Sequence, residues 1–304
     1  MIYDIRQTTS YAYESAVSRA HHLLHLVPVA RDRQRVDSAS LDIDPVPARR
    51  REATDFFDNR TTVVEIEESH QTLTVKLEAR IAVEAIAAID MAQTPAWGSV
   101  RAATYACTDI GPSSPVHFIY PSRLVPLDPD IRNYARESFA PGRPVLAGAD
   151  ELMRRIKRDF TYQPGATTVT TTPSMAFTLR RGVCQDFAHI MISGLRGLGL
   201  PAAYVSGYLR TVPRPGAAGL AGADAMHAWV MVWCGAAGGG GSGEGAGGGG
   251  WWGLDPTNAL IASEDHVVLA VGRDYADVAP VNGVVLASGQ QRVSTAVKVM
   301  PVEG

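Results

Sequence analysis

The sequence predicts an α+β protein in which a β-rich N-terminal domain precedes a part that mixes helix and strand. Apolar and polar residues alternate along most of residues 1–84, as they do in half-buried strands. After Cys184, apolar residues recur every three or four positions, which is the spacing of a helix. Short apolar strands follow that helix. With 304 residues, the chain is long enough for one large domain or two of ordinary size.

The N-terminal domain is expected to be a small antiparallel β-sandwich over residues 1–84. Its strand-like segments are residues 2–5, 10–13, 35–43, 61–67 and 73–83. A turn signal, Phe-Asp-Asn-Arg at residues 57–60, precedes the fourth of them. Short alternating strands separated by turns are typical of a sandwich.

Residues 85–149 are expected to form a linker, because prolines punctuate them. These prolines are Pro95, Pro112, Pro115, Pro121, Pro126 and Pro129. Residues 150–304 are assigned to a catalytic core that includes the C-terminal strands. This core is expected to begin with a helix over residues 150–160, with Asp150 as its N-cap and an apolar face.

A second helix is expected from Cys184 to the Gly-Leu-Gly-Leu-Pro stop at residues 197–201. The strands expected after it are residues 203–209, 227–233, 251–255 and further ones in the tail, residues 261–304. Residues 235–250 consist almost entirely of Gly, Ala and Ser, which predicts a flexible hairpin loop. A phosphate-binding loop would end in Gly-Lys-Ser/Thr, whereas this one runs into two tryptophans.

The composition gives no electrostatic reason to expect nucleic acid or an anionic membrane as a partner. Hydrophobic residues make up 46% and charged residues 19%, and the net charge is −3. Three cysteines are too few for a disulfide framework and are typical of a reducing compartment. The N-terminus lacks the pattern of a secretory signal, and the most apolar run, residues 81–90, is short and carries two acids. We therefore expect a cytoplasmic protein.

Three residues in order, Cys184, His227 and Asp255, have the chemistry of a thiol acyl-transfer site. A thiol needs a base to form a thiolate near neutral pH, and the base needs a carboxylate to orient it. Cys184 is expected at a helix N-terminus, where free N–H groups and the helix dipole favour an anion. His227 begins a strand, and Asp255 ends one that Pro256 terminates. A packed thiol, a core histidine and a turn residue are the ordinary explanations of each alone, but the three together favour a site.

Other residues fit these roles less well. His189 lies roughly 140° around the helix and about 7.5 Å along it from Cys184, so it is not expected to reach the thiol. Cys234 faces the opposite side of its strand from His227. Cys107 has no His or Lys near it in the sequence and is expected to be a packing residue. Paired zinc-ligand spacings and EF-hand spacings are absent from the sequence, so no metal or other cofactor is expected.

Several separate blocks resemble one known family. RRGVCQDFAHIMISGLRGLGLPAAYVSGYLRT from Arg180, MHAWVMVW from Met226 and WWGLDPTNAL from Trp251 are similar to the core of bacterial transglutaminase-like proteins, a superfamily often described as cysteine-protease-like. DFFDNRTTVVEIEESHQTLTVKLEARIAV from Asp55 resembles the β-rich domain that precedes this core in one bacterial branch. VGRDYADVAPVNGVVLASG from Val271 resembles the stretch that follows the Asp motif there. The resemblance covers most of the chain, and least the proline-rich and glycine-rich segments.

The resemblance implies that Cys184 is the nucleophile, His227 the general base and Asp255 its orienting partner. It also implies a papain-like α+β core, in which the Cys helix packs on an antiparallel sheet that carries the other two residues. The glycine-rich insertion between the His and Asp strands departs from the family pattern but leaves the motifs intact.

We expect such a site to cleave the amide bond of a peptide or other amide substrate through a thioester. Water would resolve the thioester in a cysteine peptidase or amidase, whereas an amine would resolve it in a transglutaminase-type acyl transfer. A catalytically silent binding scaffold is a third possibility, although an intact triad argues against it. The sequence specifies neither the substrate nor the oligomeric state.

Residues around the triad have open roles. The nucleophile's own N–H is one expected oxyanion donor, and Tyr162 and Gln163 are equally open as the second donor or as turn residues. Trp229 faces the same side of its strand as the predicted base and either shields it from water or belongs to the core. Gln185 and Asp186 suit the positive end of the helix dipole, and we expect them to cap the helix.

Overall fold

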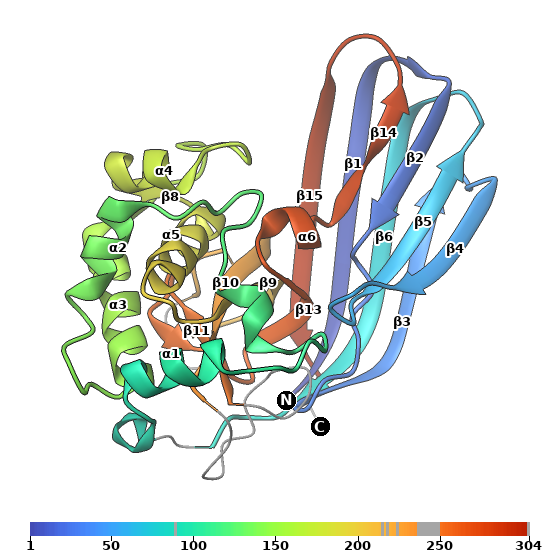
Figure 1. Ribbon diagram of the computed structural model, residues 1–304. Helices are drawn as coiled ribbons and strands as arrows, with labels where there is room; N and C mark the ends of the chain where they lie inside the picture. The colour runs from blue at the N-terminus through green and yellow to red at the C-terminus, as the bar shows by residue number, and fades with distance from the viewer. Residues whose placement is uncertain (88–89, 214–215, 217–218, 223–224, 236–249, 303–304) are drawn as a thin grey trace.

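The computed structural model consists of a β-sandwich and an α+β core that lie side by side (Figure 1). It describes residues 1–302 apart from residues 88–89, 214–215, 217–218, 223–224 and 236–249. The predicted fold class is confirmed, because a β-rich N-terminal region precedes a core that contains both helices and an antiparallel sheet.

The sandwich is made of two four-stranded antiparallel sheets, with the strand orders β15-β1-β6-β3 and β14-β2-β5-β4. Its strands are β1 (Ile2–Val17), β2 (Arg19–Leu24), β3 (Gln34–Asp44), β4 (Arg49–Thr54), β5 (Arg60–Ile66), β6 (His70–Val83), β14 (Val281–Leu286) and β15 (Gln291–Pro301). The expected turn lies between β4 and β5, where Asp58 has a φ of 59°. Only Ser18 separates β1 from β2, so the chain passes there from one sheet to the other.

Alternation of apolar and polar residues explains why these strands form a sandwich. In β6, the residues Leu73, Val75, Leu77 and Ile81 are each about 1% exposed or less, and the residues between them are mostly polar. Burial of each such side chain contributes roughly 1.5–3 kcal/mol relative to leaving it in water. The buried faces of both sheets meet in one apolar core.

The C-terminal strands correct the expected domain boundaries. β15 pairs with β1 from Tyr3 opposite Pro301 to Tyr13 opposite Gln291, and β14 pairs with β2. These strands therefore complete the sandwich that residues 1–84 begin, and they are not part of the core assigned to residues 150–304. Alternation within a strand shows which face is buried, but it does not identify the partner strand.

Residues 85–149 are not a linker, because most of their helices pack into the core. They contribute η1 (Met91–Gln93), α1 (Trp97–Tyr105), η2 (Pro115–Phe118), α2 (Pro129–Arg136) and the start of α3 (Val145–Asp159). Pro115 and Pro129 are the first residues of their helices, where a missing N–H costs no hydrogen bond. Proline here begins helices, so the frequent prolines of this segment do not mark a linker.

Helix α3 also begins earlier than expected. Its first residue is Val145, and Asp150 lies inside the helix, where its carboxylate accepts a hydrogen bond from Arg154 at 2.8 Å. Asp150 is therefore not an N-cap. The predicted apolar face is confirmed, because Leu152 and Ile156 are buried.

The core sheet has the strand order β12-β11-β10-β9-β13. Its strands are β9 (Ala202–Leu209), β10 (Met226–Trp233), β11 (Trp251–Asp255), β12 (Leu260–Ile261) and β13 (His266–Gly272), and its neighbours are β7 (Thr161–Tyr162), α4 (Pro173–Leu179), β8 (Arg181–Gly182), α5 (Cys184–Gly197) and α6 (Tyr275–Val278). β12 and β13 lie at opposite ends of this strand order, yet only residues 262–265 connect them in the chain. The sheet therefore curls until these edges approach each other.

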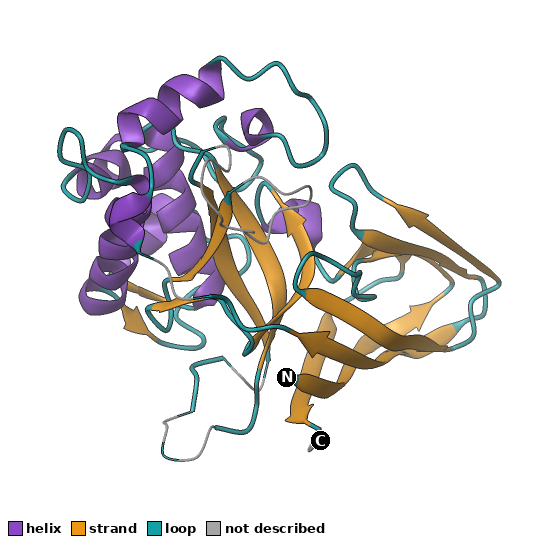
Figure 2. Ribbon diagram, turned by 90° about the horizontal axis from the view of Figure 1, so that it is seen from below, coloured by secondary structure: helices purple, strands orange, loops and turns teal. Residues whose placement is uncertain are grey.

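The core sheet lies between the helices and the sandwich (Figure 2). Val268 and Ala270 of β13 belong to the apolar cluster that contains α5, whereas Val267 and Leu269 belong to the cluster of the sandwich. β13 is thus buried on both faces, and it joins the two bodies.

The flexible loop expected at residues 235–250 falls on residues 236–249, which lie outside the described residues. Its two ends are close, because the N–H of Cys234 donates to the carbonyl oxygen of Gly250 at 2.7 Å. The insertion therefore leaves and re-enters the fold where β10 and β11 are paired.

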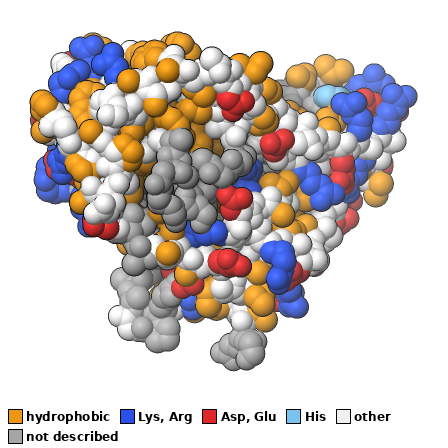
Figure 3. All heavy atoms as spheres, turned by 60° about the horizontal axis from the view of Figure 1, so that its bottom comes forward, with side chains coloured by type: hydrophobic (Ala, Val, Ile, Leu, Met, Phe, Trp, Pro, Cys, Tyr) orange, Lys and Arg blue, Asp and Glu red, His pale blue; other side chains and the backbone are white. Residues whose placement is uncertain are grey.

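The outer surface carries charges of both signs. On the face shown in Figure 3, Lys and Arg side chains form separate groups, and acidic side chains are interspersed among them over the sandwich. The described residues of this face thus do not form a continuous basic surface. None of the helices in the described part of the chain combines the length and the apolar character that crossing a bilayer requires.

Candidate active site

Cys184 is the first residue of α5, as predicted. The N-terminus of the helix is fixed by Asp186, whose Oδ2 accepts the Val183 N–H at 2.8 Å and the Thr167 hydroxyl at 2.6 Å. A Cβ at Gly182 would lie 2.5 Å from the same oxygen, so this position requires glycine. Cys184 itself is half-buried and opens towards a pocket. The capping role predicted for Asp186 is confirmed.

His227 and Asp255 are brought together by neighbouring strands. His227 is the second residue of β10, Asp255 is the last residue of β11, and the two strands pair with Val230 opposite Leu254. His227 Nε2 lies 3.0 Å from Asp255 Oδ2, and both side chains are fully buried.

The buried carboxylate of Asp255 is fully hydrogen-bonded. Oδ1 accepts the backbone N–H groups of Thr257 and Asn258 at 2.9 and 3.2 Å, and Oδ2 accepts the Asn258 side-chain amide at 2.8 Å. Burial alone would raise the pKa of Asp255, but the charge and hydrogen bond of His227 outweigh it and hold the pKa well below its ordinary value. Asp255 is therefore ionised at neutral pH.

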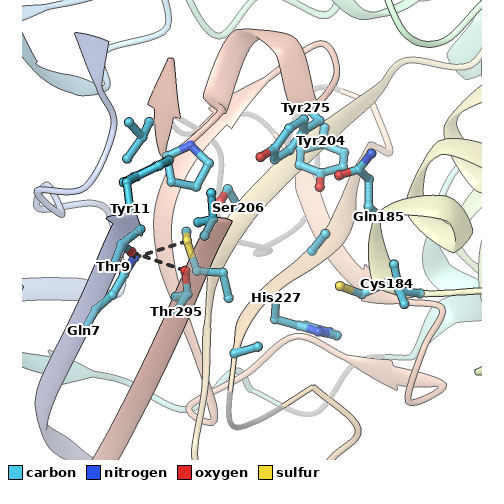
Figure 4. A pocket seen from close by; sticks show the side chains of 17 residues that line it. Gln7, Thr9, Tyr11, Cys184, Gln185, Tyr204, Ser206, His227, Tyr275 and Thr295 are labelled. Carbon is cyan, nitrogen blue, oxygen red and sulfur yellow. Dashed lines mark hydrogen bonds between the residues drawn. The ribbon is translucent and has the colours of Figure 1, made fainter. Parts of the chain in front are cut away.

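His227 is protonated at neutral pH for the complementary reason. Burial would lower its pKa, but the charges of Asp255 and of a Cys184 thiolate raise it to about 10. Its second nitrogen, Nδ1, is buried and has no hydrogen-bond partner among the described residues. Figure 4 shows Cys184 and His227 next to each other at the pocket.

The loop before β10 approaches the open side of the His227 ring. A Cβ at Gly222, whose φ is +84°, would lie 2.9 Å from His227 Nδ1 and 3.6 Å from the hydroxyl of Tyr162. Asn258 holds this loop through the backbone of Ala221, at 2.9 and 3.3 Å. Asn258 therefore connects the carboxylate to the loop that borders the histidine.

A second histidine, His266, also contacts the carboxylate, and the sequence reasoning missed it. Its Nε2 lies 3.3 Å from Asp255 Oδ2, and the side chain is buried. The Ser263 N–H donates to its Nδ1 at 3.5 Å, so Nε2 carries the hydrogen that Asp255 receives. The indole of Trp229 packs against both histidine rings, with centroids 6.2 Å from His227 and 5.3 Å from His266.

A pocket of about 340 Å³ adjoins Cys184 and His227. The core contributes Tyr204 and Tyr275 to its lining, and the sandwich contributes residues of β1 and β15. Figure 4 shows these side chains arranged around the space in front of the thiol. The pocket has the size of a small-ligand site.

The other thiols and His189 lie in different surroundings. Cys234 is buried, which raises its pKa far above the ordinary value, and Cys107 contacts Ser114 with its sulfur at 3.7 Å from the hydroxyl. His189 accepts the Tyr275 N–H at 3.3 Å, and burial lowers its pKa to about 4. Gln185 lines the pocket and makes only a long contact, 3.5 Å, with the Val169 carbonyl oxygen.

The two candidates for the second oxyanion donor, Tyr162 and Gln163, lie at the strand β7, which precedes the Cys184 helix in the chain. β7 pairs with β8, so that Tyr162 is opposite Gly182. The Tyr162 hydroxyl and His227 Nδ1 both border Gly222, since a Cβ at Gly222 would lie 3.6 Å from the hydroxyl and 2.9 Å from Nδ1. The backbone N–H of Gln163 is already used, because it donates to the Gly182 carbonyl oxygen at 2.8 Å.

Two family models match the chain. The bacterial transglutaminase-like N-terminal region matches residues 3–82, which correspond to β1–β6. The transglutaminase-like superfamily matches residues 132–256, which contain Cys184, His227 and Asp255.

Relatives match over almost the whole length. An uncharacterized protein of Mycobacterium tuberculosis is 35% identical over 306 residues, covering 99% of this chain and 93% of the relative. One from Mycobacterium leprae is 28% identical over 300 residues and covers 96% of each chain. The crystal structure of a putative cysteine protease from Cytophaga hutchinsonii shares the fold, with a TM-score of 0.69 at 21% identity over 100% of this chain and 92% of that one. The chain therefore belongs to the transglutaminase-like superfamily, in the branch that carries the bacterial transglutaminase-like N-terminal region.

Proposed function

We propose that the protein is a thiol-dependent amide-bond hydrolase, with Cys184 as nucleophile, His227 as general acid and base, and Asp255 as the carboxylate that orients His227. One observation carries the proposal. Nε2 of His227 forms a hydrogen bond with the buried carboxylate of Asp255, whereas Nδ1 has no hydrogen-bond partner among the described residues. The half-buried thiol of Cys184, at the start of α5, lies next to this ring. This division of the two ring nitrogens is what a Cys-His-carboxylate site requires.

The first half of the reaction forms a thioester. The Cys184 thiolate attacks the amide carbonyl carbon, and the carbonyl electrons move to oxygen. His227, protonated at neutral pH, then gives its Nδ1 proton to the amide nitrogen as the carbon–nitrogen bond breaks. Asp255 keeps the imidazolium in place and is not itself protonated, because its pKa is held low.

The second half releases the acid. Neutral His227 takes a proton from water, which attacks the thioester carbon, and the carbon–sulfur bond breaks to regenerate the thiolate–imidazolium pair. As the first residue of α5, Cys184 has a backbone N–H without an intrahelical acceptor, and this group can receive the oxyanion. Tyr162, whose hydroxyl borders the same glycine as His227 Nδ1, and Gln163 are the two candidates for the second donor.

An acyl transfer to an amine is the alternative, because the same thioester serves both reactions. Membership of the transglutaminase-like superfamily favours this alternative. Hydrolysis remains the first proposal, since water is always abundant and acyl transfer to an amine requires a site that excludes water from the thioester.

The test is turnover of a panel of peptide amides with and without a fluorescent primary amine. We expect free acid as the main product, loss of at least about 10³-fold in rate in Cys184→Ala, and unchanged rates in Cys107→Ala, which removes a thiol away from the pocket. Incorporation of the amine as the main product would favour acyl transfer. Unchanged turnover in Cys184→Ala would exclude Cys184 as the nucleophile.

A further inference from the structure

The pocket in front of Cys184 is closed on one side by the sandwich, which the proposed chemistry does not use. Gln7 and Thr9 of β1 and Thr295 of β15 line it across from Tyr204 of the core strand β9 (Figure 4). Both bodies thus supply polar side chains to one cavity.

Tyr204 provides a hydroxyl at the pocket on the core side. The residue is 2% exposed, its ring packs against His189 and Tyr275, and it lines the pocket. Figure 4 shows this hydroxyl pointing into the pocket. Burial, and the charge of a Cys184 thiolate, raise the pKa of Tyr204 well above its ordinary value, so the hydroxyl stays protonated and can donate. Because this hydroxyl faces the pocket, water can satisfy it there, and a ligand that displaces the water must accept its hydrogen bond or lose free energy.

On the sandwich side, hydrogen bonds run in one direction from Tyr208 through Gln7 to Thr9, and each residue donates to the next. The Tyr208 hydroxyl donates to Gln7 Oε1 at 2.5 Å, and Gln7 Nε2 donates to Thr9 Oγ1 at 3.0 Å. Because Thr9 Oγ1 accepts from Gln7, its own hydrogen points elsewhere. The nearest partner is Thr295 Oγ1, at a long 3.4 Å. The chain therefore ends in hydroxyl donors at the pocket.

The described residues that line the pocket include no Asp, Glu, Lys or Arg. A charged group placed there would lose its hydration without gaining an ion pair apart from the thiolate–imidazolium pair itself. An apolar group of the same shape would leave the hydroxyls of Tyr204 and Thr9 without partners.

We propose that Tyr204 and the Thr9–Thr295 hydroxyls bind a neutral, hydrogen-bond-accepting group of the substrate, such as a carboxamide or hydroxyl, next to the amide bond that is cleaved. This inference rests on the proposed function, because it takes Cys184 as the reacting atom. The sandwich and the core then together form the site that selects the substrate.

The probes are four stable alkylating amides: N-bromoacetyl derivatives of asparaginamide, leucinamide, aspartic acid amide and lysinamide. The first three have side chains of nearly equal shape that differ in hydrogen bonding and charge. Labelling of Cys184 is followed by peptide mapping, and each rate is divided by the rate of the same probe with 2-mercaptoethanol. This readout needs no turnover.

The expected result is that the asparagine probe labels wild-type Cys184 about 10-fold faster than the leucine, aspartate and lysine probes, the difference that one or two net hydrogen bonds make. Tyr204→Phe and Thr9→Val should each remove most of this advantage and leave the leucine probe unchanged. Thr9→Ser, which keeps the hydroxyl, should restore it. Thr8→Val is the matched control, because Thr8 lies on the opposite face of β1.

Two failures are distinguishable. If all four probes label Cys184 no faster than an exposed thiol reacts, Cys184 is not an activated nucleophile, and the proposed function fails. If labelling is fast but equal for the asparagine and leucine probes, or if Tyr204→Phe slows both alike, the proposed subsite is overturned while the proposed nucleophile stands.

Discussion

The side chain of Gln34 forms two hydrogen bonds with the backbone of Val268. Gln34 Nε2 donates to the Val268 carbonyl oxygen, and the Val268 N–H donates to Gln34 Oε1, both at 2.8 Å. Gln34 belongs to the sandwich, and Val268 lies in β13, the edge strand of the core sheet. Asn59 binds the backbone of Val271 in the same way, at 2.7 and 2.8 Å. Two side-chain amides thus take the place of a neighbouring strand and protect the edge of β13. They also fix the sandwich beside the pocket.

We predict that Gln34→Ala lowers the free energy of unfolding by about 2–4 kcal/mol, because it leaves a buried N–H and a buried carbonyl oxygen unpaired. Urea denaturation measures this loss. Gln71→Ala, at an exposed position of β6, is the control and should change the free energy of unfolding by less than about 0.5 kcal/mol. Equal denaturation midpoints for both variants would show that the Gln34 bridge does not stabilise the fold.

His266 is predicted to act as a positioning residue for Asp255. His266→Phe removes a hydrogen bond to a charged oxygen, worth about 1.5–3 kcal/mol, and should lower kcat roughly 10-fold or more with little change in KM. His266→Gln, which keeps an N–H donor, should recover most of the rate. Thermal unfolding is measured in parallel. A loss of stability with unchanged kcat, or failure of Gln to recover the rate, would assign His266 a structural role only.

The sandwich is predicted to lose stability in mild acid because of His22. Burial, together with the nearby His70 and His21, lowers the pKa of His22 to about 4, and neither ring nitrogen has a partner among the described residues. The unfolded chain binds this proton near pH 6.5, whereas the folded chain does not bind it until about pH 4. Unfolding therefore takes up a proton between these values, so stability falls as the pH drops below about 7.

Between pH 7 and pH 5 this effect should amount to about 1–2 kcal/mol, because the buried ring takes up its proton only when the protein unfolds. Urea denaturation at the two pH values should show a smaller difference in His22→Leu than in the wild type. His21→Leu, at the exposed neighbouring position, should keep most of the difference, because burial and not His21 is the main cause of the lowered pKa of His22. The same pH dependence in the wild type and His22→Leu would assign the acid sensitivity to another group.

The sequence predicted the fold class and three candidate residues because each signal is local. Cys184 starts an apolar helical repeat, and Asp255 ends a strand before a proline, so each can be placed without knowing the rest of the fold. The contact between His227 and Asp255 then follows from the pairing of two adjacent strands. Whether these residues catalyse the proposed reaction stays a prediction.

What the sequence did not predict depends on distant segments. His266 reaches Asp255 only because the core sheet curls, and a single histidine at the start of a strand carries no local signal of this. β15 pairs with β1 across almost the whole chain, which its own alternation cannot indicate. Thr9 and Tyr204 face each other for the same reason, since the pocket is created when two bodies meet. Prolines such as Pro129 do not distinguish a linker from a helix, because the first position of a helix favours them as much as a linker does.

The claim that His227 holds Cys184 as a reactive thiolate is tested most directly by the rate of Cys184 alkylation with iodoacetamide from pH 5 to pH 9, compared between the wild type and His227→Ala by peptide mapping. We predict that alkylation of the wild type stays fast into mild acid and exceeds that of Cys107 and Cys234. In His227→Ala, alkylation should become slow below about pH 8, as for an ordinary thiol. Coincident pH profiles for the two proteins, with both folded, would contradict the assignment of His227 as the partner of Cys184.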